Sequence, residues 1–222
     1  VVMVGQPAEE ITDGAAAMIA DGLFTRFPRP DYALAFHDTA DLASGVIGVK
    51  PGFALANSDS VDITVRGLGG HGAYPQTTKD PIVLASAIVM RLQTLVSREA
   101  SPFDPSVVTV GAFHGGAKHN IISDEVKLQL TVRSYSDKSR QLLLDGIKRI
   151  ARAEALASGV PEDRMPIVSV DPSGAKATYN TPELAERIRG VMVARFGAER
   201  VATPLPSMAG EDFGEFARAA GP

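Results

Sequence analysis

Two adjacent carboxylates and a histidine follow two apolar runs near the start of the chain. Glu9 and Glu10 come directly after the run 1–5, and His37 comes directly after the run 31–36. Both runs fit buried parallel strands, whose carboxyl ends share one edge of a sheet. Carboxylate and imidazole groups at such an edge form a zinc-type ligand set, and the second carboxylate could act as general base. The residues alone leave an equally good alternative, which is a solvated acidic pair at a helix N-terminus.

Two glycine-rich segments carry further polar side chains. Glycines 67, 69 and 70 precede His71, and Gly115 and Gly116 precede Asn120. Glycine lets a second backbone or a ligand approach closely. A flexible loop and a hairpin-like connection are the simpler explanations when each segment is taken alone.

Charged residues at two further positions could also serve a site. Arg133 ends an apolar run and could pair with a carboxylate through its planar fork, although a surface ion pair would explain it as well. Glu211 and Asp212 lie in an acidic turn that opens a helix, where any helix favours acids. The sequence assigns these two acids no firm role.

The elements that must position these residues follow from hydrophobic periodicity and from capping residues. A helix from Thr12 or Asp13 to about Asp21 lies between the first two apolar runs, which predicts a βαβ unit. The middle of the chain predicts strand, helix, strand, strand, helix, strand, which is a ferredoxin-like unit. These elements are expected near 57–66, 80–97, 107–113, 126–133, 136–150 and 165–170, and a last helix near 181–196. The expected domain boundaries are 1–57, 58–173 and 174–222.

Composition narrows the class of protein. The 222 residues have a net charge of −4 and contain no Lys/Arg run, which argues against a nucleic-acid partner. Cysteine is absent, so no disulfide forms, and we expect no apolar run close to the roughly 20 residues that span a bilayer. A cytoplasmic protein without membrane contact is the default expectation. The chain opens inside an apolar run and stops after an unfinished helical pattern, so we expect a truncated domain.

Several segments resemble, in order, the motifs of one family. Gln6-Pro7-Ala8-Glu9-Glu10 resembles Q-P-A-E-E, and Gly69 to Pro75 resembles G-G-H-x-A-x-P. Further matches are Phe36-His37, Gly45 to Gly52, Val108 to Gly116, Asn120-Ile121-Ile122, Thr131-Val132-Arg133 and Gly210 to Phe213. The set is similar to the aminoacylase-like metallopeptidases, and within them to the hippurate hydrolase, N-acyl-amino-acid and auxin-conjugate amidohydrolase branch.

This resemblance implies a fold and a reaction. The fold would be α/β, with a truncated metallopeptidase-type α/β/α catalytic domain interrupted by an inserted ferredoxin-like α+β lid or dimerisation domain. The reaction would be metal-dependent hydrolysis of the amide bond of N-acyl amino acids such as hippurate. Glu9 would be the general base on a metal-bound water, and Glu10 and His37 would be metal ligands. Two divalent ions are expected, zinc or manganese, with cobalt and nickel as alternatives.

The resemblance also implies roles for the inserted domain. His71 would polarise the scissile carbonyl, often in the active site of a partner subunit, and Asn120 and Arg133 would hold the carboxylate of the substrate. A homodimer through the lid domain is therefore expected, with a small N-acyl amino acid as the other partner.

One departure from the family keeps other readings open. The family also uses a Cys and a His upstream of the Glu pair and a His near the C-terminus, and the chain contains none of these. The alternatives are a catalytically incomplete fragment, a non-catalytic dimerisation or binding module, or a peptidase or desuccinylase of the same superfamily.

Overall fold

The computed structural model describes residues 1–221, which form two units that we treat separately. Unit 1 combines Val1–Asn57 with the residues from Ala175 onward, and unit 2 comprises Ser58–Gly174.

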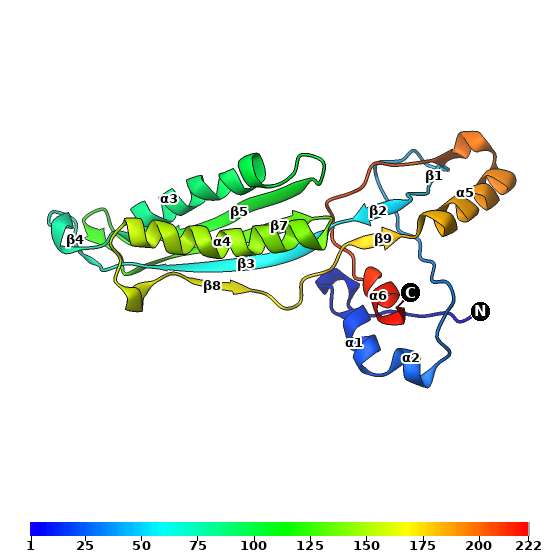
Figure 1. The fold of residues 1–222 in the computed structure, drawn as a ribbon, viewed down its shortest axis with the longest axis horizontal. Coiled ribbons are helices and arrows are strands. Elements are labelled where there is room, and N and C mark those ends of the chain that lie inside the picture. The colour runs from blue at the N-terminus through cyan, green and yellow to red at the C-terminus, as the bar shows by residue number, and fades with distance from the viewer. Residues whose placement is uncertain (222) are drawn as a thin grey trace. The chain divides into compact units, whose positions relative to one another are not determined.

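Unit 2 is a four-stranded sheet with two long helices on one face (Figure 1). The strand order is β5-β7-β3-β8, formed by β3 (Asn57–Arg66), β5 (Ser106–Gly115), β7 (Glu125–Ser134) and β8 (Ile167–Val170). The pairs β5–β7 and β3–β8 are antiparallel, with a register shift between Val110 and Ala112. Along the chain the elements run β3-α3-β5-β7-α4-β8, which confirms the ferredoxin-like order predicted from the sequence.

The two helices of unit 2 begin at the capping residues that the sequence indicates. In α3 (Pro81–Thr94), Asp80 accepts hydrogen bonds from the backbone N–H groups of residues 82 and 83, and Pro81 takes the first helical position, which needs no N–H. In α4 (Asp137–Ala157), the Ser136 hydroxyl accepts from the N–H of Ser139. Both caps satisfy N–H groups that the helix itself cannot.

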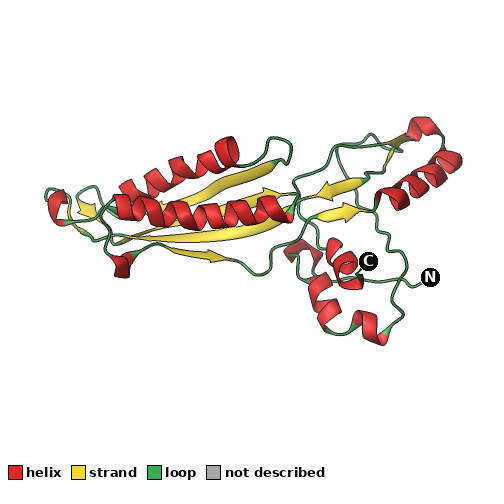
Figure 2. Cartoon of the chain, in the orientation of Figure 1, coloured by secondary structure: helices red, strands yellow, loops and turns green. Residues whose placement is uncertain are grey.

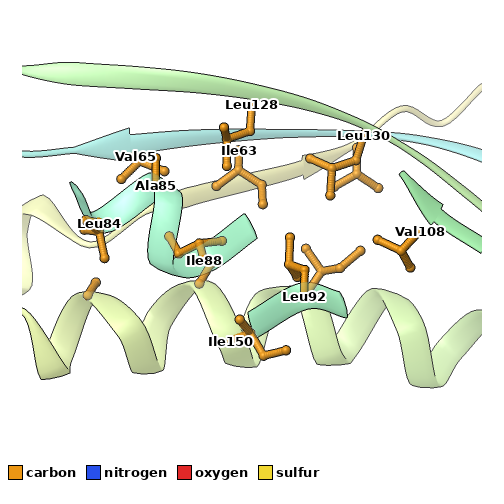
Figure 3. Packing of buried hydrophobic residues seen from close by; sticks show 14 of the residues in the cluster. Ile63, Val65, Leu84, Ala85, Ile88, Leu92, Val108, Leu128, Leu130 and Ile150 are labelled. Carbon is orange, nitrogen blue, oxygen red and sulfur yellow. The ribbon is translucent and has the colours of Figure 1, made fainter. Parts of the chain in front are cut away.

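The core of unit 2 lies between the sheet and these helices (Figure 3). Alternate residues of β3 and β7 are buried, and the inner faces of α3 and α4 supply the opposite wall. Full burial of one such aliphatic side chain stabilises the fold by about 1.5–3 kcal/mol. The fully buried large side chains are Val61, Ile63, Val65, Leu84, Ile88, Leu92, Leu95, Val126, Leu128, Val132, Leu143 and Ile147.

By length and apolar composition alone, the helical stretch Pro81–Glu99 could cross a membrane. The expectation that no apolar run approaches that length was therefore wrong. In this structure the stretch turns Leu84, Ile88 and Leu92 into the core of unit 2, as the core helix of a folded domain does. That packing explains the apolar residues on the inner face of α3.

Unit 1 contains short strands and short helices. The strand β1 (Ile47–Gly48) pairs in parallel with β10 (Val201–Ala202), and β2 (Gly52–Leu55) pairs antiparallel with β9 (Thr178–Asn180). The helices are α1 (Gly14–Ala20), α2 (Leu23–Arg26), α5 (Pro182–Phe196) and α6 (Gly214–Ala220). Long loops join them, most visibly between α2 and β1 (Figure 2).

The two apolar runs that sequence reasoning takes as strands, 1–5 and 31–36, are not strands in this structure. Val1, Met3 and Phe36 are largely exposed. A strand is stabilised by ladder hydrogen bonds to a neighbour, and neither run pairs with another strand of the described residues. The predicted βαβ unit is therefore absent from the described part of the chain, although its helix is present as α1.

Candidate active site

A sharply bent loop presents the two adjacent glutamates. Glu9 and Glu10 begin a single 3-10 turn, Glu9–Ile11, and the residues on either side, Ala8 and Thr12, both have a φ of 54°. Left-handed backbone is uncommon for residues other than glycine and marks a turn held by its surroundings. The turn leaves Glu9 half-buried and Glu10 exposed.

A second acidic segment, which directly precedes α6, meets this loop. Oxygen atoms of Glu9, Glu211 and Asp212 all lie within 4.8 Å of one another. Burial, followed by the charges of Glu211, Glu10 and Asp212, raises the pKa of the Glu9 carboxyl. A carboxylate with raised proton affinity is suited to accept a proton from water.

His37 lies within electrostatic reach of this acidic cluster. Its Nδ1 is 2.5 Å from the carbonyl oxygen of Asp38, and this hydrogen bond is the main cause that raises the pKa of the imidazole. Burial acts in the opposite direction, and the charges of Glu211 and Glu9 raise the pKa further. The structure thus brings an imidazole and several carboxylates of unit 1 into one neighbourhood.

The donor set suits a divalent cation. Carboxylate oxygens and an imidazole nitrogen together are typical ligands of zinc, manganese, cobalt and nickel. Glu10 and His37 are not members of the three-carboxylate group, and the two oxygens of Asp212 already accept hydrogen bonds from Gln6 and Ala15. Oε1 of Glu211 likewise accepts the backbone N–H of Phe213 at 3.0 Å, so part of this acidic cluster serves the hydrogen bonds of the protein itself.

In unit 2, a small two-stranded sheet presents His71. The strands β4 (Gly70–His71) and β6 (Ile121–Ile122) pair antiparallel, and the N–H of Gly72 donates to the carbonyl of Asn120 at 2.8 Å. A Cβ added at Gly72 would lie 3.1 Å from that carbonyl oxygen, so the glycine permits the close approach.

The ring of His71 has a defined hydrogen-bonding state. Its Nδ1 accepts the backbone N–H of Ala73 at 3.1 Å, and the ring lies 5.6 Å from that of Tyr74. When one ring nitrogen of a neutral imidazole accepts, the other carries the proton. The exposed Nε2 is therefore a hydrogen-bond donor.

Arg133 and Asn120 lie near opposite ends of strand β7. Asn120 lies between β5 and β7, directly before β6 (Ile121–Ile122), whereas Arg133 is the penultimate residue of β7, where its Nε donates to the hydroxyl of Thr131 at 3.0 Å. At about 3.4 Å per residue, the strand separates them by about 30 Å. The structure thus groups His71 with Asn120 and places Arg133 apart from both.

Sequence reasoning gave Glu211 and Asp212 no role, yet the structure places them against Glu9. The available signal was two consecutive acids before a short helix, which is also what an ordinary helix start shows. Only the fold reveals that residues about 200 positions apart in the sequence are in contact.

Comparison with known proteins gives the site a context. A family model described as the M20 peptidase dimerisation domain matches residues 53–158. An N-acetyldiaminopimelate deacetylase of Leuconostoc citreum is 35% identical over 209 residues, which cover 94% of this chain and 53% of that protein. A hippurate hydrolase of Campylobacter jejuni is 36% identical over 213 residues, which cover 95% of this chain and 54% of that protein.

The fold comparison agrees. A crystal structure from Bacillus subtilis, described as a dinuclear metal-binding peptidase of the M20 family, superposes with a TM-score of 0.70 at 26% identity and covers 95% of this chain and 51% of that one. The chain spans about half the length of the curated relatives it matches.

Proposed function

Because this chain belongs to the M20 peptidase family, we propose that the whole protein hydrolyses the amide bond of N-acyl amino acids with divalent metal as cofactor. The observation that carries the proposal is the meeting of Glu9 with Glu211 and Asp212, close to His37. A proton acceptor beside potential metal ligands is what amide hydrolysis by water requires.

Glu9 is the proposed general base. It takes a proton from the attacking water and returns it to the nitrogen of the departing amino acid, so that the carboxylate is restored at the end of the cycle. The half-buried position beside Glu211 favours this role because it raises the affinity of the carboxylate for a proton.

Glu10 and His37 are the proposed metal ligands in this chain. Bound metal would polarise the carbonyl and make water more acidic. Two ions are supported by the description of the Bacillus subtilis structure as dinuclear, and zinc and manganese are the proposed metals.

His71 is the proposed stabiliser of the negative charge that develops on the carbonyl oxygen. Its Nε2 proton is free to be donated because Nδ1 is held by the N–H of Ala73. Asn120 and Arg133 are the proposed ligands of the substrate carboxylate, which Arg can bind through two parallel hydrogen bonds.

These assignments favour an active site shared between two copies of the chain. At about 3.4 Å per strand residue, Asn120 and Arg133 of one copy lie about 30 Å apart. This separation is too large for one N-acyl amino acid to contact both. Two copies in a symmetric dimer can supply one residue each. The match of unit 2 to a dimerisation domain supports the same arrangement.

The side of unit 2 formed by β5 and α3 offers a surface for this dimer. Strand β5 is an edge of the sheet, and α3 packs beside it. The outer side of α3 exposes Val83 and Met90, at 66% and 72% of their full surface. An edge strand next to exposed apolar side chains favours pairing with a second copy.

The relatives leave the acyl group undecided. One is named for an N-acetyl substrate and another for hippurate, whose acyl group is aromatic. We propose N-acyl amino acids with a free carboxylate as the substrate class, hippurate-like compounds included.

The decisive experiment uses the full-length protein. Metal content is measured after purification, and hydrolysis is followed on hippurate, N-acetyl amino acids, N-succinyl amino acids and dipeptides. We expect about two metal ions per chain and turnover of the N-acyl substrates, which is lost on chelation and restored by zinc or manganese. Bound metal without turnover of any N-acyl substrate would contradict the proposed reaction, and a protein without metal or turnover would be a binding module.

Glu9→Gln tests the proposed base separately. Gln keeps the size of the side chain but has no carboxylate to accept a proton, so we expect wild-type metal content and loss of turnover. An active Glu9→Gln enzyme would refute the assignment.

A further inference from the structure

The loop that carries the two glutamates is tied to a buried carboxylate from the far end of the sequence. Asp212 is 1% exposed, and among the described residues of unit 1 it is the one buried acid. Its Oδ1 accepts from Nε2 of Gln6 at 2.5 Å, and its Oδ2 accepts from the backbone N–H of Ala15 at 2.9 Å. The two donors lie on opposite sides of Glu9 and Glu10, so one carboxylate holds both arms of the loop.

Inside the loop the contacts are polar as well, because the N–H of Thr12 donates to the carbonyl of Glu9 at 2.6 Å and the N–H of Asp13 donates to that of Ala8 at 3.3 Å. None of the residues of the turn Glu9–Ile11 is buried, and Ile11 is exposed. A Cβ added at Gly14 would lie 1.6 Å from the carbonyl oxygen of Pro7, which shows how closely the two arms approach. With no apolar anchor in the turn, polar contacts must maintain the left-handed residues on either side of it.

Contacts with α6 hold Asp212 in place. The backbone carbonyl of Asp212 accepts the N–H of Glu215 at the start of α6, and Phe216 of that helix is buried. The ring of Phe216 packs edge-to-face with Phe24 and Phe213, at centroid distances of 6.3 and 6.0 Å. Asp212 is thus a fixed point against which the loop can be aligned.

We propose that Asp212 is a positioning residue, which aligns the loop so that Glu9 and Glu10 keep their places relative to Glu211 and His37. The catalytic consequence rests on the function proposed above, whereas the alignment of the loop does not. Two competing explanations predict different behaviour. A metal ligand would leave its oxygens open to a cation, and a simple helix-start acid would make no contact with the loop.

Asp212→Asn is the first test because it keeps the size of the side chain and removes one acceptor. The amide can accept from only one of the two donors, and its NH2 group then faces the other donor. In the full-length metal-loaded enzyme we expect kcat to fall by about ten- to a hundredfold, as small misplacement of a reacting group does. We expect KM to change by less than about threefold, because the substrate contacts proposed above lie on other segments.

A compensating variant separates positioning from general damage. In Gln6→Glu combined with Asp212→Asn, the new carboxylate accepts from the Asn NH2 while the Asn carbonyl accepts from Ala15, so both bonds return with one reversed. The net charge equals that of the wild type. We expect recovery of most of the lost kcat, and Gln6→Glu alone, which opposes two carboxylates, should be impaired. The matched control is Asp13→Asn, the same change at an exposed loop residue that makes no capping hydrogen bond, and it should behave as wild type.

A readout that needs no activity completes the test. Amide hydrogen exchange of residues 6–15 in the metal-free protein should accelerate in Asp212→Asn and return toward wild type in the double variant, and metal affinity should follow the same order. Unchanged exchange and metal affinity in Asp212→Asn would overturn the proposal, as would a double variant no better than the single one. If the wild type hydrolyses no N-acyl amino acid, the proposed function fails, but exchange and metal affinity still decide the role of Asp212. If Asp212→Asn does not fold, Gln6→Met, which removes only the donor, is measured in its place by the same criteria.

Discussion

Activity should reappear when two inactive variants of the full-length protein are mixed, His71→Ala and Glu9→Gln. The prediction follows from the sheet of unit 2, which places His71 and Asn120 at one end and Arg133 at the other. If His71 of one copy serves the active site that contains Glu9 of the other copy, a mixed dimer contains one site with both Glu9 and His71 intact. Random exchange makes half of the dimers mixed, so about a quarter of all sites are restored in a symmetric dimer.

The size of the individual defects can be worked out from the site. The loss of one oxyanion donor costs about 3–4 kcal/mol, which corresponds to a loss of about 150- to 900-fold in kcat. His71→Gln is the matched variant because its terminal NH2 can approach the position of Nε2, and we expect it to be more active than His71→Ala. His71→Ala should change KM little because the interaction is made mainly in the transition state.

The assay is hydrolysis of an N-acyl amino acid after the variants are mixed, incubated and returned to assay conditions. A covalently linked dimer of each variant, which cannot exchange, serves as the control and should show no recovery. A mixture no more active than its components, under conditions where exchange is demonstrated, would refute the shared site. A loss below tenfold in kcat for His71→Ala would refute the role of this residue.

Three other predictions concern stability and assembly. The carboxylate of Asp59 is 1% exposed, and Arg140 holds it through three N–H···O contacts of 2.6–3.1 Å. Arg140→Met leaves this buried charge without its partner, so it should lower the free energy of unfolding by about 3–5 kcal/mol in urea titrations. Arg140→Met combined with Asp59→Asn should lower it less because no buried charge is left. Glu9→Gln should raise the free energy of unfolding of the metal-free protein at pH 7, by no more than about 0.5 kcal/mol because solvent screens a half-exposed carboxylate. The raised pKa of Glu9 means that folding disfavours its ionised form. The gain in unfolding free energy should therefore vanish as the pH falls below about 4, where the side chain at position 9 is neutral in the wild type and in the variant alike. Met90→Glu should shift the full-length protein from dimer to monomer in sedimentation velocity, and an unchanged dimer would move the interface away from α3.

The sequence predicts unit 2 well because its signals are local. The alternation Val61, Ile63, Val65 marks β3, and Asp80-Pro81 marks the start of α3, where the cap hydrogen bonds are found. Such patterns depend on residues within one strand or one turn of helix, so they can be read without knowledge of the rest of the fold.

Unit 1 and its site are predicted less well because their determinants are distant in the sequence. The runs 1–5 and 31–36 have the composition of strands, but a strand also needs a neighbour. Glu9 and His37 were singled out by their places after those runs, and the structure does bring them into one neighbourhood. The contact of Asp212 with Gln6 spans 206 positions, and no local pattern reports it.

The segment of His71 and the turn of Glu9 are held in place by different interactions. They should therefore respond differently to single substitutions. The short strand of His71 follows a strand whose inner face belongs to a continuous apolar core, so its position is fixed by packing of many side chains. The turn at Glu9 buries no side chain and depends on directional contacts to Asp212 and on the close fit at Gly14. Packing is spread over many contacts, so a single core substitution lowers stability before it moves His71. A hydrogen-bonded anchor concentrates the constraint in one residue, so a single substitution at position 212 displaces the glutamates while most of the stability is retained.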